Sequence, residues 1–216
     1  MTAYTLVALA CFSSTIGCTH LLHIKDLPPP PAAAKAPTRP LVVGVAADRT
    51  AADAKGYVEA IGRSLTMNKA VQRVVYPYAS GDQVDVVADV TVSPTYDGTG
   101  KNFLINFPGF LVFAPCWYGY EYHANPHTKV ELKTPDGKPI DTISWEYDYV
   151  FHQADIGRTW TEISWLEVGA IALIGGIVFV NYDTDQTPEF IGKVAPNYGD
   201  NIATLIANRL STLGAP

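Results

Sequence analysis

The sequence has few charged residues and no strongly basic segment. Charged residues make up 17% of the 216 residues and apolar residues 48%, so disorder of the whole chain is excluded. The formal net charge is −6, with 15 Lys+Arg against 21 Asp+Glu. Because nucleic-acid binding depends on clustered positive charge, this balance argues against nucleic acid as a partner.

The chain also lacks the marks of several other protein classes. It has no run of twenty apolar residues, so a conventional membrane-spanning helix is not expected. Its 3 cysteines cannot form a disulfide scaffold. It contains no Gly-x-Ser-x-Gly motif, phosphate-binding loop or dinucleotide fingerprint. What remains is a single folded domain with a substantial core.

The N-terminus has the pattern of a lipoprotein signal. Residues 4–12 form a short apolar run of the length of a signal-peptide core. The next segment, Thr15-Ile16-Gly17-Cys18, resembles the lipobox of bacterial lipoproteins. In that family the signal peptidase cuts before the cysteine, which then carries the lipid. The resemblance implies a signal peptide at residues 1–17 and lipidation of Cys18.

Two features depart from the family pattern. Position 15 is Thr rather than Leu, and no Lys or Arg precedes the apolar run. Residues 8–11, Ala-Leu-Ala-Cys, also match the lipobox, but cleavage there would leave a very short signal peptide. An ordinary secretory signal without lipidation is the alternative. In the Gram-negative family an Asp after the cysteine retains the protein in the inner membrane. Thr19 therefore implies the periplasmic face of the outer membrane.

A proline-rich segment follows the lipobox. Six of the 16 prolines fall within residues 28–40. Since proline fixes φ and removes the amide donor, this segment is expected to be extended polyproline II. Residues 18–40 are therefore predicted to form a lipid-anchored tether, which spans about 40 Å over residues 28–40 at ~3.1 Å per residue. A spacer without a specific length is the alternative.

The first part of the remaining chain has a strand–helix–strand pattern. Residues 41–45 form a continuous apolar run typical of a buried strand, and residues 71–76 form a second. Between them, apolar residues recur every three or four positions and predict a helix; they are Ala54, Val58, Ile61 and Leu65. Side chains at its start are expected to cap it; they are Asp48, Thr50 and Asp53.

Alternating strands dominate the rest of the chain. Residues 84–93 alternate apolar and polar, and residues 143–151 are expected to pair antiparallel with residues 127–133. A final helix is predicted from Asp200 or Asn201 to Gly214. This order predicts an α+β fold over residues 41–216, with a mainly antiparallel sheet and two helices on one face.

The element order is similar to that of a small periplasmic domain. That domain is shared by the N-terminal region of TolB, the lipoprotein activators of penicillin-binding proteins and the curli-export pore lipoprotein. The similarity covers residues 41–95, 127–153 and 195–213, and rests on element order together with the lipobox and the proline tract. It implies a protein-binding module rather than an enzyme.

Two apolar segments do not fit this simple pattern. The first apolar segment, residues 103–120, has no charge and contains four Phe, one Trp and two Tyr, while its two prolines exclude a regular helix. The second apolar segment, residues 163–180, ends in thirteen uncharged residues, which as a helix would span about 20 Å. Such segments are expected to pack internally, to contact another subunit or envelope protein, or to dip into the bilayer.

We expect the first apolar segment to be a contact surface, because large desolvated aromatics carry most interface energy. The candidate interface residues are Phe110, Leu111, Phe113, Trp117, Tyr118 and Tyr120. The predicted function is that of an outer-membrane lipoprotein and non-catalytic assembly module, which contacts the membrane through its lipid and binds other envelope proteins or itself. A membrane-inserting or pore-forming lipoprotein is the alternative.

A cell-wall hydrolase is the second alternative. Cys116 lies in an apolar, proline-flanked run where a thiol pKa rises, so it is not expected to be a nucleophile. His123 and His127 are four apart, but Pro126 favours a polar turn there over a shared metal. The sequence therefore predicts no catalytic residue, no cofactor and no metal site.

Overall fold

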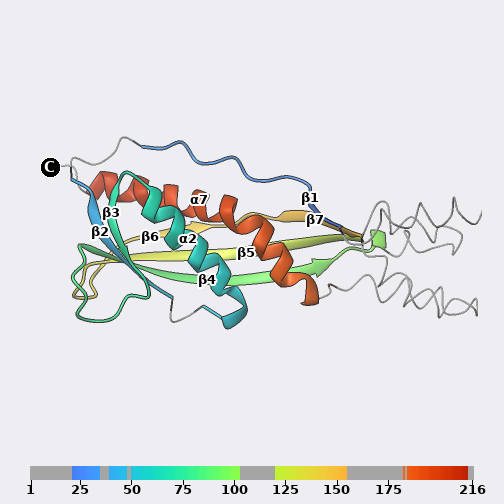
Figure 1. Ribbon diagram of the computed structural model, residues 1–216, viewed down its shortest axis with the longest axis horizontal. Helices are drawn as coiled ribbons and strands as arrows, with labels where there is room; N and C mark the ends of the chain where they lie inside the picture. Colours follow the sequence, from blue (N-terminus) through green and yellow to red (C-terminus); the bar gives the residue numbers. More distant parts are fainter. Residues whose placement is uncertain are drawn as a thin grey trace, which may run out of the picture. The chain divides into compact units, whose positions relative to one another are not determined.

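The computed structural model describes residues 21–34, 39–47, 50–102, 120–154, 182 and 184–213. Its strands are β1 (Leu21–Ile24), β2 (Leu41–Ala46), β3 (Val71–Val75), β4 (Val86–Gly98), β5 (Tyr120–Lys133), β6 (Pro139–Trp145) and β7 (Tyr149–Ala154). Its helices are α2 (Lys55–Met67) and α7 (Thr187–Leu213), which the short 3-10 turns η1 (Ala52–Ala54) and η4 (Thr184–Gln186) precede (Figure 1).

The strands form a 7-stranded sheet in the order β1-β7-β5-β4-β2-β3, with β6 also paired to β5. The pairings of β7 with β1 and β5, and of β6 with β5, are antiparallel. Among the pairings with a described register, the parallel ones are those of β2 with β3 and with β4. The predicted α+β class, with a mostly antiparallel sheet and two helices, is confirmed. Within the described part of the chain, no helix has the length and apolar character needed to cross a bilayer.

The chain divides into two compact units. Unit 1 consists of Met1–Asp26, Tyr96–Ala124 and Tyr149–Thr184. Unit 2 consists of Leu27–Thr95, Asn125–Asp148 and Asp185–Pro216. Both β4 and β5 begin in one unit and continue into the other.

In unit 2, helices α2 and α7 lie side by side over one face of the sheet (Figure 1). Their contact is close at Gly199, where a Cβ atom would lie 2.6 Å from the carbonyl oxygen of Ala60. One turn further on, the Ser64 hydroxyl donates to Asp200 Oδ1 at 2.6 Å. A side chain larger than hydrogen at Gly199 would therefore push the helices apart.

Tyr198 of α7 joins the helices to the sheet of unit 2. Its ring centroid lies 4.8 Å from that of Tyr57 on α2 and 5.3 Å from that of Trp145 on β6, both edge-to-face. Its hydroxyl is 2.5 Å from Thr128 Oγ1 on β5. Burial of the ring raises the pKa of Tyr198, so its hydroxyl stays protonated and hydrogen-bonded.

The predicted tether, residues 18–40, is folded where the structure describes it; residues 18–20 and 35–38 lie outside the described ones. Residues 21–24 form β1, and residues 27–34 lie along α7 within unit 2. Asn197 donates to the carbonyl oxygen of Pro28 at 3.1 Å. Asn208 donates to Ala32 O at 2.9 Å and accepts from the Ala34 N–H at 2.7 Å. The sequence predicted no strand or helix contact in this segment.

The helix boundaries differ from those predicted. At α2 no side chain caps the first turn; the Thr50 hydroxyl instead donates to Val90 O and accepts from the Val92 N–H of β4. The last helix begins at Thr187, well before the predicted Asp200 or Asn201, and continues through Pro196. Asp200 and Asn201 do not cap the last helix, because Asp200 accepts from Ser64 and Asn201 donates to Asn197 O within the helix. Asp48, another predicted cap, lies outside the described residues.

The predicted strand at residues 143–151 is two strands, β6 and β7. β6 pairs antiparallel with the second half of β5, as predicted. β7 pairs with the first half of β5, so that Tyr120 lies opposite Gln153 and Ala124 opposite Tyr149. The alternating pattern continues through the bend between these strands, which is why periodicity alone did not divide them.

Unit 1 contains β1, β7 and the first half of β5. Residues paired directly across neighbouring strands share a face of the sheet. One face is closed, with exposed fractions of 2% or less; its members are Leu22, Tyr120, Tyr122, Ala124, Tyr149, Phe151 and Gln153. The other face is polar, because His23, His152 and Glu121 lie in one row across β1, β7 and β5.

Candidate functional site

The strand ends of unit 1 are the points from which the chain enters and leaves the two apolar segments. The first apolar segment, up to residue 119, connects Asn102 to Tyr120, and residues 155–181 connect Ala154 to Tyr182. These connecting residues lie outside the described ones. Tyr120, the first residue of β5, lies opposite Gln153, one residue before β7 ends. The first apolar segment and the connection that contains the second therefore leave unit 1 at neighbouring strand ends.

Asn102 fastens the two ends of the first apolar segment together. Its side-chain Nδ2 donates to the carbonyl oxygen of Glu121 at 2.9 Å, and its Oδ1 accepts from the Glu121 N–H at 2.8 Å. The side chain is fully buried, at 0% exposure. The amide thus replaces a neighbouring strand and satisfies both main-chain groups of Glu121. The first apolar segment begins and ends at one fixed point.

The Glu121 carboxylate is held among three cationic or potentially cationic groups. Lys101 Nζ lies 2.8 Å from Oε1, His152 Nε2 lies 3.4 Å from Oε2, and His123 Nε2 lies 3.9 Å from Oε1. The hydrogen bond from Lys101, with smaller contributions from the histidines, holds the pKa of Glu121 below its ordinary value. A carboxylate stabilised in this way is a poor general acid or base at neutral pH. The cluster therefore fits an ion-pair role at the base of the first apolar segment.

An aromatic cluster fixes the point at which the chain returns from the second apolar segment. Tyr182 stacks on Tyr96 of β4, with ring centroids 4.8 Å apart and planes 11° apart. It also meets Tyr122 of β5 and Phe151 of β7 edge-to-face, at 5.5 and 6.1 Å. Such ring pairs add about 0.5–1.5 kcal/mol each beyond burial. The second apolar segment is thus also anchored on the strands of unit 1.

Gln153 is an unusual member of the closed face. It is only 1% exposed, yet neither its Oε1 nor its Nε2 has a hydrogen-bond partner among the described residues. It lies between Leu22 of β1 and Tyr120 of β5. An unpaired buried amide costs about 1–3 kcal/mol. No sequence pattern predicted this residue or Asn102, since both depend on contacts between distant segments.

Most of the predicted interface residues lie outside the described ones: Phe110, Leu111, Phe113, Trp117 and Tyr118. Cys18 and Cys116 lie outside them as well. Tyr120 is described, and its side chain is 2% exposed on the closed face of unit 1. Any contact made by the first apolar segment must therefore come from residues before Tyr120.

The predicted polar turn at residues 123–127 is wrong, because β5 is continuous from Tyr120 to Lys133. His123 faces Glu121, whereas His127 Nδ1 lies 2.9 Å from Glu146 Oε1. Four residues of a strand span about 13 Å, too far for both imidazoles to bind one metal. In the described parts of the chain, no three His, Cys, Asp or Glu side chains converge as a metal site requires.

A groove of about 330 Å³ lies between α2 and β3 in unit 2. Its lining residues are Glu59, Gly62, Arg63, Thr66, Val74 and Tyr76. Desolvation, followed by the charge of Glu59, raises the pKa of Tyr76, so the phenol remains protonated. The lining residues of this groove include no cysteine and no histidine.

No known family model matches the chain, and no curated protein matches it. Among solved structures, a minor lipoprotein from Acinetobacter baumannii is 12% identical, with a TM-score of 0.35 over 72% of this chain and 91% of its own. Rare lipoprotein B from Shewanella oneidensis is 10% identical, with a TM-score of 0.32 over 70% and 94%.

A PelC dodecamer from Paraburkholderia phytofirmans is 12% identical to this chain, with a TM-score of 0.27 over 84% of this chain and 98% of its own. All three TM-scores lie below 0.5, so no residue role is transferred from these proteins. The first two are lipoproteins by name.

Proposed function

We propose that this protein is a lipoprotein of the outer membrane, anchored at its periplasmic face through Cys18, and that it acts as a non-catalytic binding module. Its partner is another envelope protein or a second copy of the chain. The contact is made by the first apolar segment, with Leu111, Phe113, Trp117 and Tyr118 as the main contributors. The observation that carries this proposal is the pair of hydrogen bonds from Asn102 that closes the base of that segment.

A closed base matters for binding because it lowers the entropy cost of association. A segment whose ends are already fixed has fewer conformations to lose when it meets a partner. Large aromatic side chains supply most of the energy at such contacts. The first apolar segment has aromatic residues and no charge, and Asn102 is fully buried where the segment begins. These features together favour binding over turnover.

The test is co-isolation of the protein with its partners from solubilised envelopes. The variant carrying both Phe113→Ser and Trp117→Ser should lose its partners, or lose the pairing of two differently tagged copies, while its lipidation is unchanged. Met67→Ser is the matched control, because Met67 is 76% exposed on α2 and its removal should leave binding intact. Undiminished binding by the double variant would contradict the proposal.

A membrane-inserting role is the second candidate, because the first apolar segment and the connection that contains the second leave unit 1 at neighbouring strand ends. Dye release from vesicles separates the two functions. Release by the wild-type protein, but not by the variant with both Phe113→Ser and Trp117→Ser, would favour insertion over protein binding.

A further inference from the structure

We propose that one end of unit 1 lies against the surface of the lipid bilayer. This anchor end consists of the beginning of β1, the end of β7, the beginning of β5 and the Asn102 turn; its residues are Leu21, Leu22, Gly100, Lys101, Asn102, Tyr120, Glu121, Gln153 and Ala154. The inference rests on the proposed lipidation of Cys18 and adds to it the orientation of the protein on the membrane.

The lipid and the sheet are separated by very little chain. Cys18 precedes Leu21 by three residues, and three extended residues span at most about 11 Å. Leu21 already belongs to β1 and pairs with Ala154 of β7. The proline-rich residues cannot act as a spacer here, because they follow β1 in the chain and Pro28 is bonded to α7. The acyl chains therefore enter the bilayer close to the end of β7.

The first apolar segment and the connection that contains the second leave unit 1 near the same end. Residue 119 precedes Tyr120, the partner of Gln153, and residue 155 follows Ala154, the partner of Leu21. The starting point of the first apolar segment is held to Glu121 by Asn102. The second apolar segment follows only after residues 155–162, which include Asp155, Arg158 and Glu162. The lipid and the uncharged first apolar segment thus emerge at one end of three paired strands. Apolar side chains presented there meet a partly apolar interface rather than water.

The electrostatics of the anchor end fit a lipid surface. Glu121 would repel anionic headgroups if its charge were unpaired, but Lys101 neutralises it at 2.8 Å. The Lys101 side chain is 71% exposed, which leaves it able to face headgroup phosphates as well. Basic residues beside an anionic membrane contribute about 1 kcal/mol each. The contact site of the proposed function therefore lies at the membrane, within reach of partners in or on the same bilayer.

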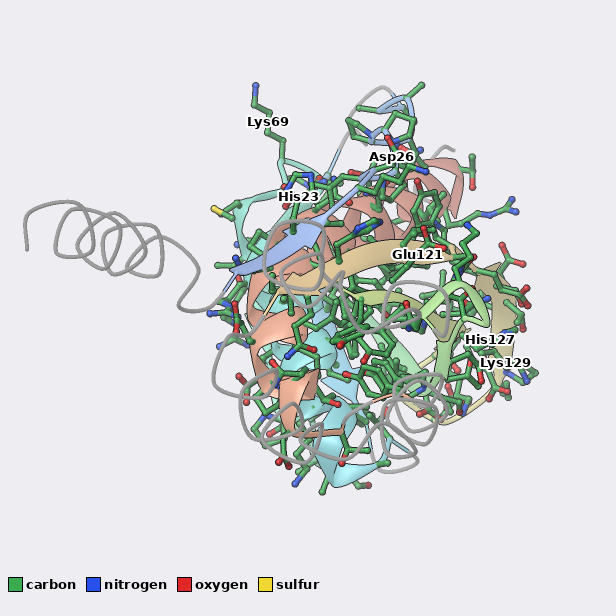
Figure 2. The ribbon with its side chains drawn as sticks, turned by 90° about the vertical axis from the view of Figure 1, so that its right-hand side faces the viewer. His23, Asp26, Lys69, Glu121, His127 and Lys129 are labelled. Atoms are coloured by element: carbon green, nitrogen blue, oxygen red, sulfur yellow. The ribbon has the colours of Figure 1, made fainter. Side chains whose placement is uncertain are left out.

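The test measures how close fluorescent probes in unit 1 lie to lipid headgroups. The full-length lipidated protein, with Cys116→Ser, is reconstituted into phosphatidylethanolamine–phosphatidylglycerol vesicles that contain a headgroup spin label as quencher. Single-cysteine variants Gly100→Cys and Asp26→Cys carry the probe. Gly100 tolerates a side chain, since nothing lies within 4 Å of its Cβ position. Asp26 is exposed and lies five residues, about 16 Å, beyond Leu21 (Figure 2).

We expect the probe at Gly100 to be quenched several-fold more than the probe at Asp26. His23→Cys provides a second, independent comparison along β1, because His23 is exposed and only two residues from Leu21. Its quenching should exceed that at Asp26. Equal quenching at all three positions, or stronger quenching at Asp26, in protein whose mass shows the acyl chains would overturn the orientation and leave the proposed function standing. Protein without acyl chains would overturn both.

Discussion

Replacing Asn102 by Leu removes the closure of the first apolar segment at nearly constant volume. The substitution leaves the N–H and the carbonyl of Glu121 without their partners at 2.8 and 2.9 Å. Each unpaired buried polar group costs about 1–3 kcal/mol, and Glu121 is only 9% exposed. Some water reaches a strand end, so we expect Asn102→Leu to lower the free energy of unfolding by about 2–4 kcal/mol.

Gln153→Met is the matched control for this change. Gln153 is as buried as Asn102 and belongs to the same unit, but neither of its polar side-chain atoms has a partner. Replacing an unpaired amide by an apolar side chain of similar shape removes a desolvation cost without creating a cavity. We therefore expect Gln153→Met to raise the free energy of unfolding by about 1–2 kcal/mol.

Both variants are measured by urea unfolding of the mature lipidated protein in detergent, together with amide hydrogen exchange. The amide of Glu121 should exchange much faster in Asn102→Leu than in the wild-type protein, and its rate should rise by more than that of the amide of Val130 in the core of β5. The reasoning is refuted if Asn102→Leu unfolds at the wild-type urea concentration with its Glu121 amide still protected. It is also refuted if the two variants shift stability in the same direction.

Three further predictions concern the helices and the charge cluster. Gly199→Ala should destabilise the fold by about 1–3 kcal/mol in thermal unfolding, because the new Cβ atom would lie 2.6 Å from a main-chain oxygen of α2. Gly192→Ala is the control: no atom lies within 4 Å of its Cβ position, so it should stabilise the fold by up to ~1 kcal/mol. Lys101 lowers the pKa of Glu121, so their pairing stabilises the fold above the unfolded pKa of the carboxyl and is lost as pH falls through the lowered folded pKa. Lys101→Met should accordingly destabilise at neutral pH and have little effect in strong acid, as unfolding at both pH values will show. Asn208→Ala removes two hydrogen bonds to the proline-rich segment. The free energy needed to detach this segment from α7 should fall by about 1 kcal/mol, which amide hydrogen exchange at Ala34 will show as a faster rate.

The elements that periodicity predicted correctly depend on local patterning. The alternation in residues 84–93 corresponds to β4, and the apolar spacing from Ala54 to Leu65 corresponds to α2. In each case the decisive residues lie within a few positions of one another.

The elements that the sequence did not predict depend on distant contacts. β1 has only four residues and exists through its pairing with β7, far along the chain. The early start of α7 was not predicted because Pro196 lies within it, and proline favours a helix break. The helix continues through Pro196 because it packs on α2 and the sheet. The pairing of Asn102 with Glu121 joins residues on either side of the first apolar segment, and no spacing rule predicts it.

The most direct test of the account is the mass of the N-terminal peptide of the protein purified from cell membranes. Trypsin should release the peptide from Cys18 to Lys25, and the account predicts that this peptide carries acyl chains on Cys18 and no residue before it. An unmodified peptide, or a mature chain that begins at another residue, would contradict the anchor and, with it, the orientation of unit 1 on the membrane.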